Sequence, residues 1–172
     1  MKLPLRILFL CTGNSCRSII AEALANHLGA GQLVAHSAGS QPTGEVNPHA
    51  LAVLARHHIP VGEVASQSWD AFADQTFDLV VTVCDNAAGE SCPVWLGKTL
   101  KAHWGIADPA PVQGDDETVA LAFERTLRAL TVRLEALLAL PLESMGPAEL
   151  VAALGDIQQR LSHSSQPHSL PG

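Results

Sequence analysis

The chain has 172 residues, which is enough for one domain with a full hydrophobic core and too few to expect two. Apolar residues make up 47% of it and charged residues 16%, a balance typical of soluble globular proteins. The net charge of -7 argues against nucleic acid or an anionic membrane as a partner, because such partners are usually bound by a basic stripe that this sequence lacks. Any anion that the protein binds must therefore be captured by local groups.

The cysteines are interpreted through the compartment in which the protein is expected. No window reaches the roughly 18 uninterrupted apolar residues typical of a membrane span, and the start MKLPLRILFL has no signal-peptide cleavage site. We therefore expect a cytoplasmic protein, in which thiols stay reduced. Reactive thiols or metal ligands are then expected before a disulfide framework at the four cysteines, Cys11, Cys16, Cys84 and Cys92.

The first half of the chain alternates between predicted strands and helices. Residues 6–11, RILFLC, form an apolar run that predicts a strand buried on both faces, and helical spacing of apolar residues predicts a helix over 18–28. A second strand is predicted at 33–39. It is followed by a helix from 48 to about 57 with an asparagine N-cap and a proline in its first turn. The apolar run 78–84, DLVVTVC, predicts a further strand that also ends at a cysteine.

The second half begins with a predicted loop over 85–98, DNAAGESCPVWLGK, which contains the glycine, proline and asparagine typical of loops. A short strand is predicted at 101–106. Apolar residues at helical spacing then predict a long amphipathic helix over 117–140 and a shorter helix over 147–161. The tail 162–172 has no core-forming residues after its start and is expected to be disordered.

This alternation predicts an α/β fold built from parallel βαβ units with right-handed crossovers. Ligands of such sheets bind beyond the carboxyl ends of the strands. Cys11, Cys84 and Asp108 all follow predicted strands. We therefore expect these three residues to lie along the same edge of the sheet.

The segment between Cys11 and Arg17 predicts an anion site. Its small or polar residues run into the start of a helix, so their backbone N–H groups can form a cradle for a tetrahedral oxyanion. Arg17 adds a planar fork that matches two oxygens of such an anion. These positive surroundings are expected to lower the pKa of Cys11 and populate its nucleophilic thiolate, to which Ser18 can donate a hydrogen bond. The predicted anion-binding residues are Thr12, Gly13, Asn14, Ser15, Cys16, Arg17 and Ser18.

Two other interpretations of this segment fit the sequence less well. Cys11 could be a buried residue at a strand end and Arg17 a surface charge. This interpretation does not explain the ordered series of small polar residues between them. A zinc site would need cysteines about two to four residues apart, whereas the gaps here are Cys-x4-Cys and Cys-x7-Cys. The positive charge of Arg17 would also repel a zinc ion bound in this loop. We therefore expect no metal and no cofactor.

Three segments of the chain resemble those of a known family. C-x5-R-S after the first strand, with a late Asp-Pro, is similar to the signature of the low-molecular-weight protein tyrosine phosphatases. CTGNSCRS, VTVCDNAAGESCP and HWGIADPA together resemble the arsenate reductases built on that fold. The resemblance covers residues 5 to about 140. It implies a three-layer αβα fold with a four-stranded parallel sheet in which the strands 6–11 and 78–84 are neighbours.

The resemblance also implies roles for individual residues. Cys11 is the implied nucleophile, Arg17 the oxyanion clamp and Asp108 the general acid. A phosphatase hydrolyses the resulting cysteinyl intermediate with water, whereas a reductase needs a second thiol that attacks Cys11, releases arsenite and leaves a disulfide. We expect Cys84 to supply this thiol. Neighbouring strands lie about 4.8 Å apart and disulfides span Cα separations of about 4.4 to 6.8 Å, so a modest loop movement would join the two.

Cys92 is the expected third thiol of the reductase. The loop that contains Gly89 is flexible enough to bring Cys92 onto Cys84, and the resulting disulfide would carry the oxidation to thioredoxin, or to a glutaredoxin or low-molecular-weight thiol. Some reductases of this group separate these two cysteines by seven positions, whereas Cys84 and Cys92 differ by eight. The extra residue falls in the loop, so we expect the relay to survive. The alternative for Cys84 is an apolar core cysteine, and Cys16 is expected only to shape the cradle.

The substrate is expected to be small and inorganic. Tyrosine phosphatases of this fold usually carry a tyrosine just after Asp-Pro, but Asp108-Pro109 is followed by Ala110 and the chain contains no tyrosine. This favours arsenate over a phosphotyrosine peptide. Trp95 and Trp104 could form an aromatic wall, although core packing is expected of both.

Two alternative functions and a domain division complete the expectations. The first alternative is a low-molecular-weight phosphatase that hydrolyses phosphomonoesters through a phosphocysteine, and the second is an oxyanion-binding or redox-sensing protein without turnover. We expect a phosphatase-like arsenate reductase domain over 1–140, a helical extension over 141–161 and a disordered tail over 162–172. The extension lies outside the resemblance and is interpreted as a cap on the domain or a contact surface.

Overall fold

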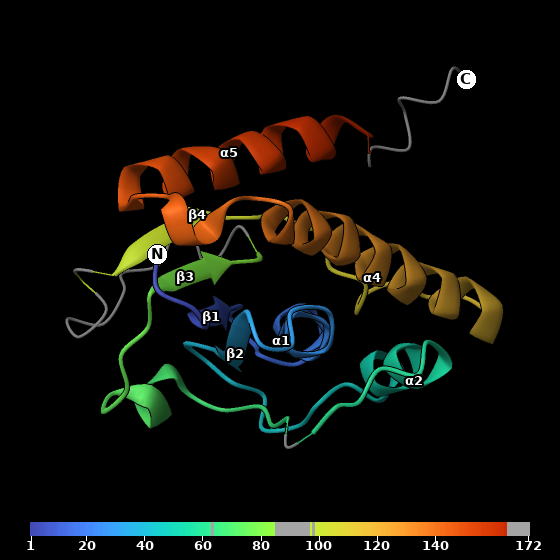
Figure 1. Cartoon of the computed structure of the whole chain (residues 1–172). Coiled ribbons are helices and arrows are strands. Elements are labelled where there is room, and N and C mark those ends of the chain that lie inside the picture. Colours follow the sequence, from blue (N-terminus) through green and yellow to red (C-terminus); the bar gives the residue numbers. More distant parts are fainter. Residues whose placement is uncertain (63, 85–96, 98, 165–172) are drawn as a thin grey trace.

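The computed structural model describes residues 1–62, 64–84, 97 and 99–164. Its centre is a four-stranded parallel sheet with the strand order β2-β1-β3-β4 (Figure 1). The strands are β1 (Leu5–Leu10), β2 (Leu33–Ala38), β3 (Leu79–Thr82) and β4 (Leu100–His103). The predicted α/β fold with a four-stranded parallel sheet is confirmed, and β1 and β3 are neighbours in it.

Strand β1 is buried on both faces, as its continuous apolar run predicts. Ile7 and Phe9 point into one hydrophobic cluster, and Leu8 and Leu10 point into a second cluster on the opposite face. All four side chains are almost completely inaccessible to solvent. A strand with apolar side chains on both faces can only lie in the interior of a sheet that is covered on both sides.

The helices begin at capping residues that the sequence contains. Asn47 accepts a hydrogen bond from the His49 amide at 2.8 Å, and Asp115 accepts one from the Thr118 amide at 2.8 Å. Each of these side chains satisfies an amide that the first turn leaves unpaired. The helices are α1 (Arg17–Leu28), α2 (Pro48–Arg56), α4 (Asp116–Leu138) and α5 (Pro147–Ser164), with short 3₁₀ helices η1 (Trp69–Phe72) and η3 (Leu142–Ser144).

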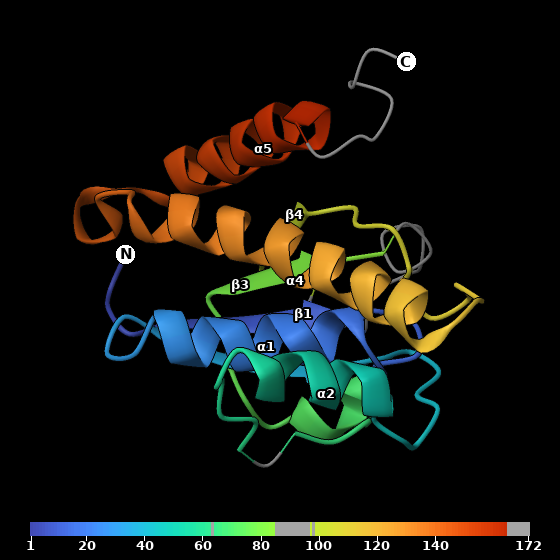
Figure 2. The same cartoon turned by 90° about the vertical axis from the view of Figure 1, so that its right-hand side faces the viewer.

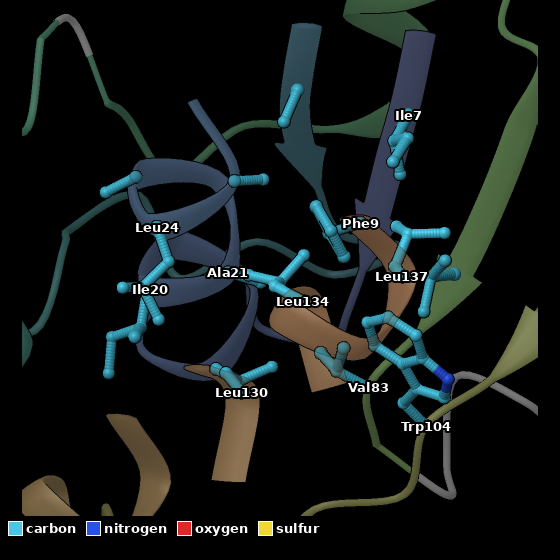
Figure 3. Close-up of a cluster of buried hydrophobic side chains, with 14 of the residues drawn as sticks. Ile7, Phe9, Ile20, Ala21, Leu24, Val83, Trp104, Leu130, Leu134 and Leu137 are labelled. Carbon is cyan, nitrogen blue, oxygen red and sulfur yellow. The ribbon is translucent and has the colours of Figure 1, made fainter. Parts of the chain in front are cut away.

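The two faces of the sheet are covered differently. Helices α1 and α4 pack over one face, where their apolar side chains join Ile7 and Phe9 of β1 in one hydrophobic cluster (Figures 2 and 3). The opposite face is covered by the segment around η1, which supplies Phe72 and Phe77 to the second cluster. Helix α5 packs against α4 and against the edge strand β4 (Figure 1).

Several predicted boundaries need correction. Strand β4 ends at His103 rather than at 106, and β3 spans four residues rather than the predicted 78–84. Helix α5 continues to Ser164, so residues 162–164 are helical and not part of the expected disordered tail. The remainder of that tail, 165–172, and most of the predicted loop 85–98 lie outside the described residues.

Within the described ranges, no helix combines the length and the apolar character that crossing a membrane requires.

Candidate active site

The three chemically distinctive residues lie at one edge of the sheet, as predicted. Cys11 directly follows β1, Cys84 follows β3 by two residues, and Asp108 follows β4 by five. The register pairs Leu10 with Thr82 and Thr82 with His103, so these strands end side by side. The carboxyl ends of adjacent parallel strands thus bring together residues that are far apart in the sequence.

The loop 11–16 is held with its backbone carbonyls turned outward. The carbonyl oxygens of Thr12, Gly13 and Ser15 accept hydrogen bonds of 3.0 Å from backbone amides of residues 41, 43 and 47. In a planar trans peptide the N–H points opposite to the C=O. The amides of the residues that follow these three therefore point to the inner side of the loop, an arrangement that suits the predicted anion cradle.

Asn14 fixes the conformation of this loop. Its φ of 45° lies in the left-handed region, which asparagine tolerates better than most residues, and its side chain is fully buried. The Asn14 amide nitrogen donates to Ser18 Oγ at 2.8 Å and to Ser37 Oγ at 3.0 Å, and its oxygen accepts from the Gln67 amide at 2.8 Å. Ser18 accepts from Asn14, so its own hydroxyl proton can be donated elsewhere in the loop.

Arg17 lies at the end of the loop and faces Asp108. Its Nη1 donates to the carbonyl of Ile106 at 2.9 Å, and its Nη2 is 3.5 Å from Asp108 Oδ2. Its Nε is buried and has no hydrogen-bond partner among the described residues. A buried donor without a partner is costly, so Nε is a donor that an oxyanion in the loop can satisfy.

Asp108 is the most exposed member of the site. Its side chain is 39% accessible, and its Oδ1 accepts a hydrogen bond of 3.0 Å from the Ala110 amide. The same oxygen lies 3.9 Å from the sulfur of Cys16. A carboxyl group that borders the loop and remains accessible can exchange protons with both solvent and a bound anion.

The sulfur of Cys84 lies at the start of the loop, beside the residue that follows Cys11. The Thr12 amide donates to Cys84 Sγ at 3.4 Å, and the Thr12 hydroxyl lies 3.8 Å from the same sulfur. Cys11 and Cys84 are both almost fully buried. The two cysteines therefore lie near each other at the ends of neighbouring strands, and the loop movement expected to join them stays a prediction.

The nearby Cys84 thiol changes the acidity that was predicted for Cys11. The Cys84 thiol and burial raise the pKa of Cys11 above its ordinary value of 9.0, whereas the Arg17 guanidinium and the Gly13 amide act to lower it. The expectation of a lowered pKa was wrong because two buried thiols close together disfavour a negative charge on either sulfur. The Arg17 guanidinium and the Gly13 amide stabilise a Cys11 thiolate, but the Cys84 thiol and burial favour the protonated form.

Cys16 has a different environment. Burial and the negative charge of Asp108 raise its pKa from 9.0 to about 11, and Arg17 opposes them only partly. Because the pKa of Cys11 is raised as well, acidity does not separate the roles of the two thiols, and the cradle-shaping role of Cys16 stays a prediction.

The remaining predicted residues are Cys92 and the two tryptophans that could have formed an aromatic wall. Cys92 and Trp95 lie outside the described residues. Trp104 is fully buried in the core, so it forms no wall for a substrate. In the part of the chain that the structure describes, no group of three His, Cys, Asp or Glu side chains could hold a metal ion.

The sequence did not reveal the residues that support the loop from below. Ser37, Gln67 and Glu22 form a buried network with Asn14, in which the Ser37 hydroxyl donates to the Glu22 carboxylate. Burial raises the pKa of Glu22 from 4.5 to about 7, although the Ser37 hydrogen bond acts in the opposite direction. These residues lie on separate elements and have no shared motif, so only the folded arrangement identifies them.

Comparison with known proteins agrees with this geometry. The family model of the low molecular weight phosphotyrosine protein phosphatases matches residues 6–148. The chain therefore belongs to this family, as the three motifs predicted.

Within the family, the chain is similar to proteins named arsenate reductase. It is 40% identical to that of Halalkalibacterium halodurans over 119 residues, which span 69% of this chain and 84% of the relative. It is 36% identical to that of Bacillus subtilis over 129 residues, or 75% and 91% of the two chains. A solved structure described as an arsenate reductase in the phosphate binding state aligns with a TM-score of 0.61 and 28% identity, covering 78% of this chain and 97% of the other.

Proposed function

We propose that this protein is an arsenate reductase that uses Cys11, Cys84 and Cys92 in series. The observation that supports this proposal most directly is the position of Cys84, whose sulfur lies 3.4 Å from the Thr12 amide, next to Cys11 at the start of the loop 11–16. A phosphatase needs only the first of these thiols, whereas a reductase needs both. The similarity to proteins named arsenate reductase adds independent support.

In the first step, the thiolate of Cys11 attacks the arsenic of arsenate. The inward-pointing amides of the loop and the Arg17 guanidinium bind the oxygens, and the buried Nε of Arg17 offers a donor for one of them. A bond forms between sulfur and arsenic while one arsenic–oxygen bond breaks. Asp108 gives a proton to the departing hydroxyl group, which leaves as water.

The second step transfers the electrons. The thiolate of Cys84 attacks the sulfur of Cys11, so an S–S bond forms and the sulfur–arsenic bond breaks with its electron pair on arsenic. As(V) is thereby reduced to As(III) and leaves as arsenite, and two thiols are oxidised to one disulfide. The proton lost by Cys84 balances the charge left on the arsenite oxygens. This step requires the two sulfurs to meet, and the position of Cys84 Sγ beside Thr12 supports it.

The third step regenerates Cys11. The thiolate of Cys92 attacks Cys84, which releases the Cys11 thiolate and leaves a Cys84–Cys92 disulfide. An external dithiol then reduces this disulfide. We propose thioredoxin as that reductant, with a glutaredoxin or a low-molecular-weight thiol as the alternative. A cycle that ends in thiol reduction belongs in a reducing compartment, for which we propose the cytoplasm.

Coupled assays test this proposal. Arsenate-dependent oxidation of NADPH is measured with thioredoxin and thioredoxin reductase, beside hydrolysis of an aryl phosphate, for wild type and for Cys11→Ser, Cys84→Ser and Cys92→Ser. We expect all three variants to lose steady-state arsenate turnover. Cys84→Ser should retain any aryl phosphate hydrolysis that the wild type has, because water rather than a thiol completes that reaction.

Cys16→Ser is the matched control, because it removes a buried thiol of the same loop that the relay does not use. It should keep arsenate turnover within about a factor of three of wild type. Full turnover in both Cys84→Ser and Cys92→Ser would contradict the relay. Efficient aryl phosphate hydrolysis without arsenate turnover in the wild type would make the protein a phosphatase instead, and replacing thioredoxin with glutaredoxin and glutathione identifies the reductant.

A further inference from the structure

Helix α5 lies almost entirely beyond the part of the chain that matches the family. The match ends at residue 148, and α5 spans Pro147–Ser164. The helix buries Leu150, Leu154 and Ile157 against the core beside α4 and β4 (Figure 1). An added helix that packed only through these apolar side chains would be a cap, but α5 also makes polar contacts that lead toward the site.

Two hydrogen bonds join α5 to the segment that follows β4. The Trp104 indole donates to the carbonyl of Leu154 at 3.3 Å, and the Gln158 side-chain amide donates to the carbonyl of Gly105 at 3.3 Å. Trp104 is fully buried between the two elements (Figure 3 shows its position in the core). Helix α5 therefore holds residues 104 and 105 from the side opposite to β3.

The orientation of the Gln158 amide is determined by Arg133. This arginine is 99% buried in α4, and its Nε donates to Gln158 Oε1 at 2.9 Å. A guanidinium only donates, so the oxygen of Gln158 must face it and the NH₂ group must face Gly105. The buried charge thus orients a donor toward the backbone after β4.

The same segment carries the groups that position Arg17 and Asp108. The amides of Trp104 and Ile106 donate to the carbonyls of Thr82 and Val83 at 2.8 and 3.3 Å. On the other side, the carbonyl of Ile106 accepts from Arg17, and Asp108 follows two residues later. Short hydrogen-bonded segments transmit position well because they have few free torsions.

We propose that Gln158 of α5 is a positioning residue for the general acid, acting through residues 104–106 on Asp108. This inference rests on the proposed function, since it assumes that Asp108 delivers the proton. It gives the added helix a role in the reaction itself. The loop 11–16 is held by other contacts, so arsenate binding should depend little on α5.

The first part of the test measures structure without activity. Hydrogen exchange of the full-length protein is followed at the amides of residues 104–106 for wild type, Gln158→Met and Trp104→Phe. Loss of one hydrogen bond should raise exchange there about five- to tenfold, because a typical bond is worth about 1 kcal/mol, and should leave α1 unchanged. Arg160→Met, an exposed change two residues along the helix that removes only an ion pair with Asp156 of α5, should alter neither segment. Unchanged exchange in Gln158→Met and Trp104→Phe would overturn the proposal whatever the protein catalyses.

The second part measures turnover of arsenate. Gln158→Met and Trp104→Phe should lower kcat about three- to tenfold with KM changed less than twofold, since the loop still binds the anion. In an Asp108→Asn background, Gln158→Met should have no further effect on kcat, because its action passes through the missing acid. An equal loss of kcat in both backgrounds, or an effect on KM alone, would overturn the positioning role. Absence of arsenate turnover in the wild type would refute the proposed function, while the exchange result still decides whether α5 braces the segment.

Discussion

The reactivity of Cys11 depends on one neighbouring side chain more than on any other. The hydrogen bond with Cys84 is the largest contribution that raises the pKa of Cys11, ahead of burial. Cys84→Ala removes it and leaves the Arg17 guanidinium and the loop amides in place. We therefore expect a lower pKa for Cys11 and about tenfold or faster alkylation of it by iodoacetamide at pH 7, since each pKa unit changes the thiolate fraction tenfold.

The alkylation rate is followed from pH 5 to pH 10, with the modified cysteine identified by peptide mass. Cys16→Ala is the control, because Cys16 does not contribute to the acidity of Cys11. An unchanged pH midpoint in Cys84→Ala would mean that burial, rather than the second thiol, keeps the Cys11 thiol protonated.

Arg17 performs three tasks that a lysine cannot perform together. It donates to the Ile106 carbonyl, lies beside Asp108 and has a buried Nε that no described residue satisfies. We expect Arg17→Lys to lower kcat/KM for arsenate by about a hundred- to a thousandfold, because an ammonium has no planar fork for two oxygens. Steady-state kinetics measure this, with Arg56→Lys, an exposed change in an ion pair with Glu124, as the control. Comparable kinetics for wild type and Arg17→Lys would show that charge alone is sufficient.

At the scale of an element, the loop between β1 and α1 depends on both the conformation and the side chain of Asn14. Asn14→Ala removes three buried hydrogen bonds and leaves a non-glycine residue at φ 45°, so it should destabilise the protein by about 2 to 4 kcal/mol. Asn14→Gly loses the same bonds but relieves the backbone, and should be about 1 kcal/mol more stable than Asn14→Ala. Urea denaturation measures both. Equal stability of the two variants would show that the left-handed backbone carries no strain.

The regular elements could be predicted because their signals are local. A continuous apolar run identified β1, and Asn47-Pro48 marked the start of α2 at the residue where the structure has it. The 3₁₀ helix η1 was not predicted, since a single short turn has no periodicity to detect. The end of β4 was misplaced because residues 104–106 still hydrogen-bond to the end of β3 after the strand has ended.

The site could be predicted only in part, for a related reason. The spacing of Cys11 and Arg17 lies within one loop, so the sequence reveals it. The proximity of Cys11 to Cys84 and the support of Asn14 by Ser37 and Gln67 join separate elements. Acidity follows from such contacts, so the pKa of Cys11 was predicted in the wrong direction.

At the scale of the whole molecule, a chain with a net charge of -7 must attract an anion through a few local groups. The same fold partly buries an acidic group, Glu22, near the loop for which anion binding is proposed, where it accepts a hydrogen bond from Ser37. Its carboxyl group is thus part of the support for Asn14. Its protonation should affect the stability of the entire fold, because unfolding returns the group to water.

The direction of that effect follows from the two pKa values. Glu22 has an ordinary pKa of 4.5 and a folded-state pKa of about 7, so between these values the folded protein binds the proton that the unfolded chain has lost. The free energy of unfolding should therefore decrease as the pH rises from about 4.5 to 7, and then level off. Glu22→Gln removes this dependence, so from pH 5 to pH 8 its stability relative to wild type should rise by about 2 to 3 kcal/mol. Urea denaturation from pH 5 to pH 8 measures the difference in the free energy of unfolding between the variant and the wild type. Contributions that both proteins share, such as those of the histidines, cancel in this difference. Glu135→Gln, at an exposed position of α4, should follow the wild type at every pH, and a Glu22→Gln curve parallel to the wild type would show that Glu22 titrates normally in the folded protein.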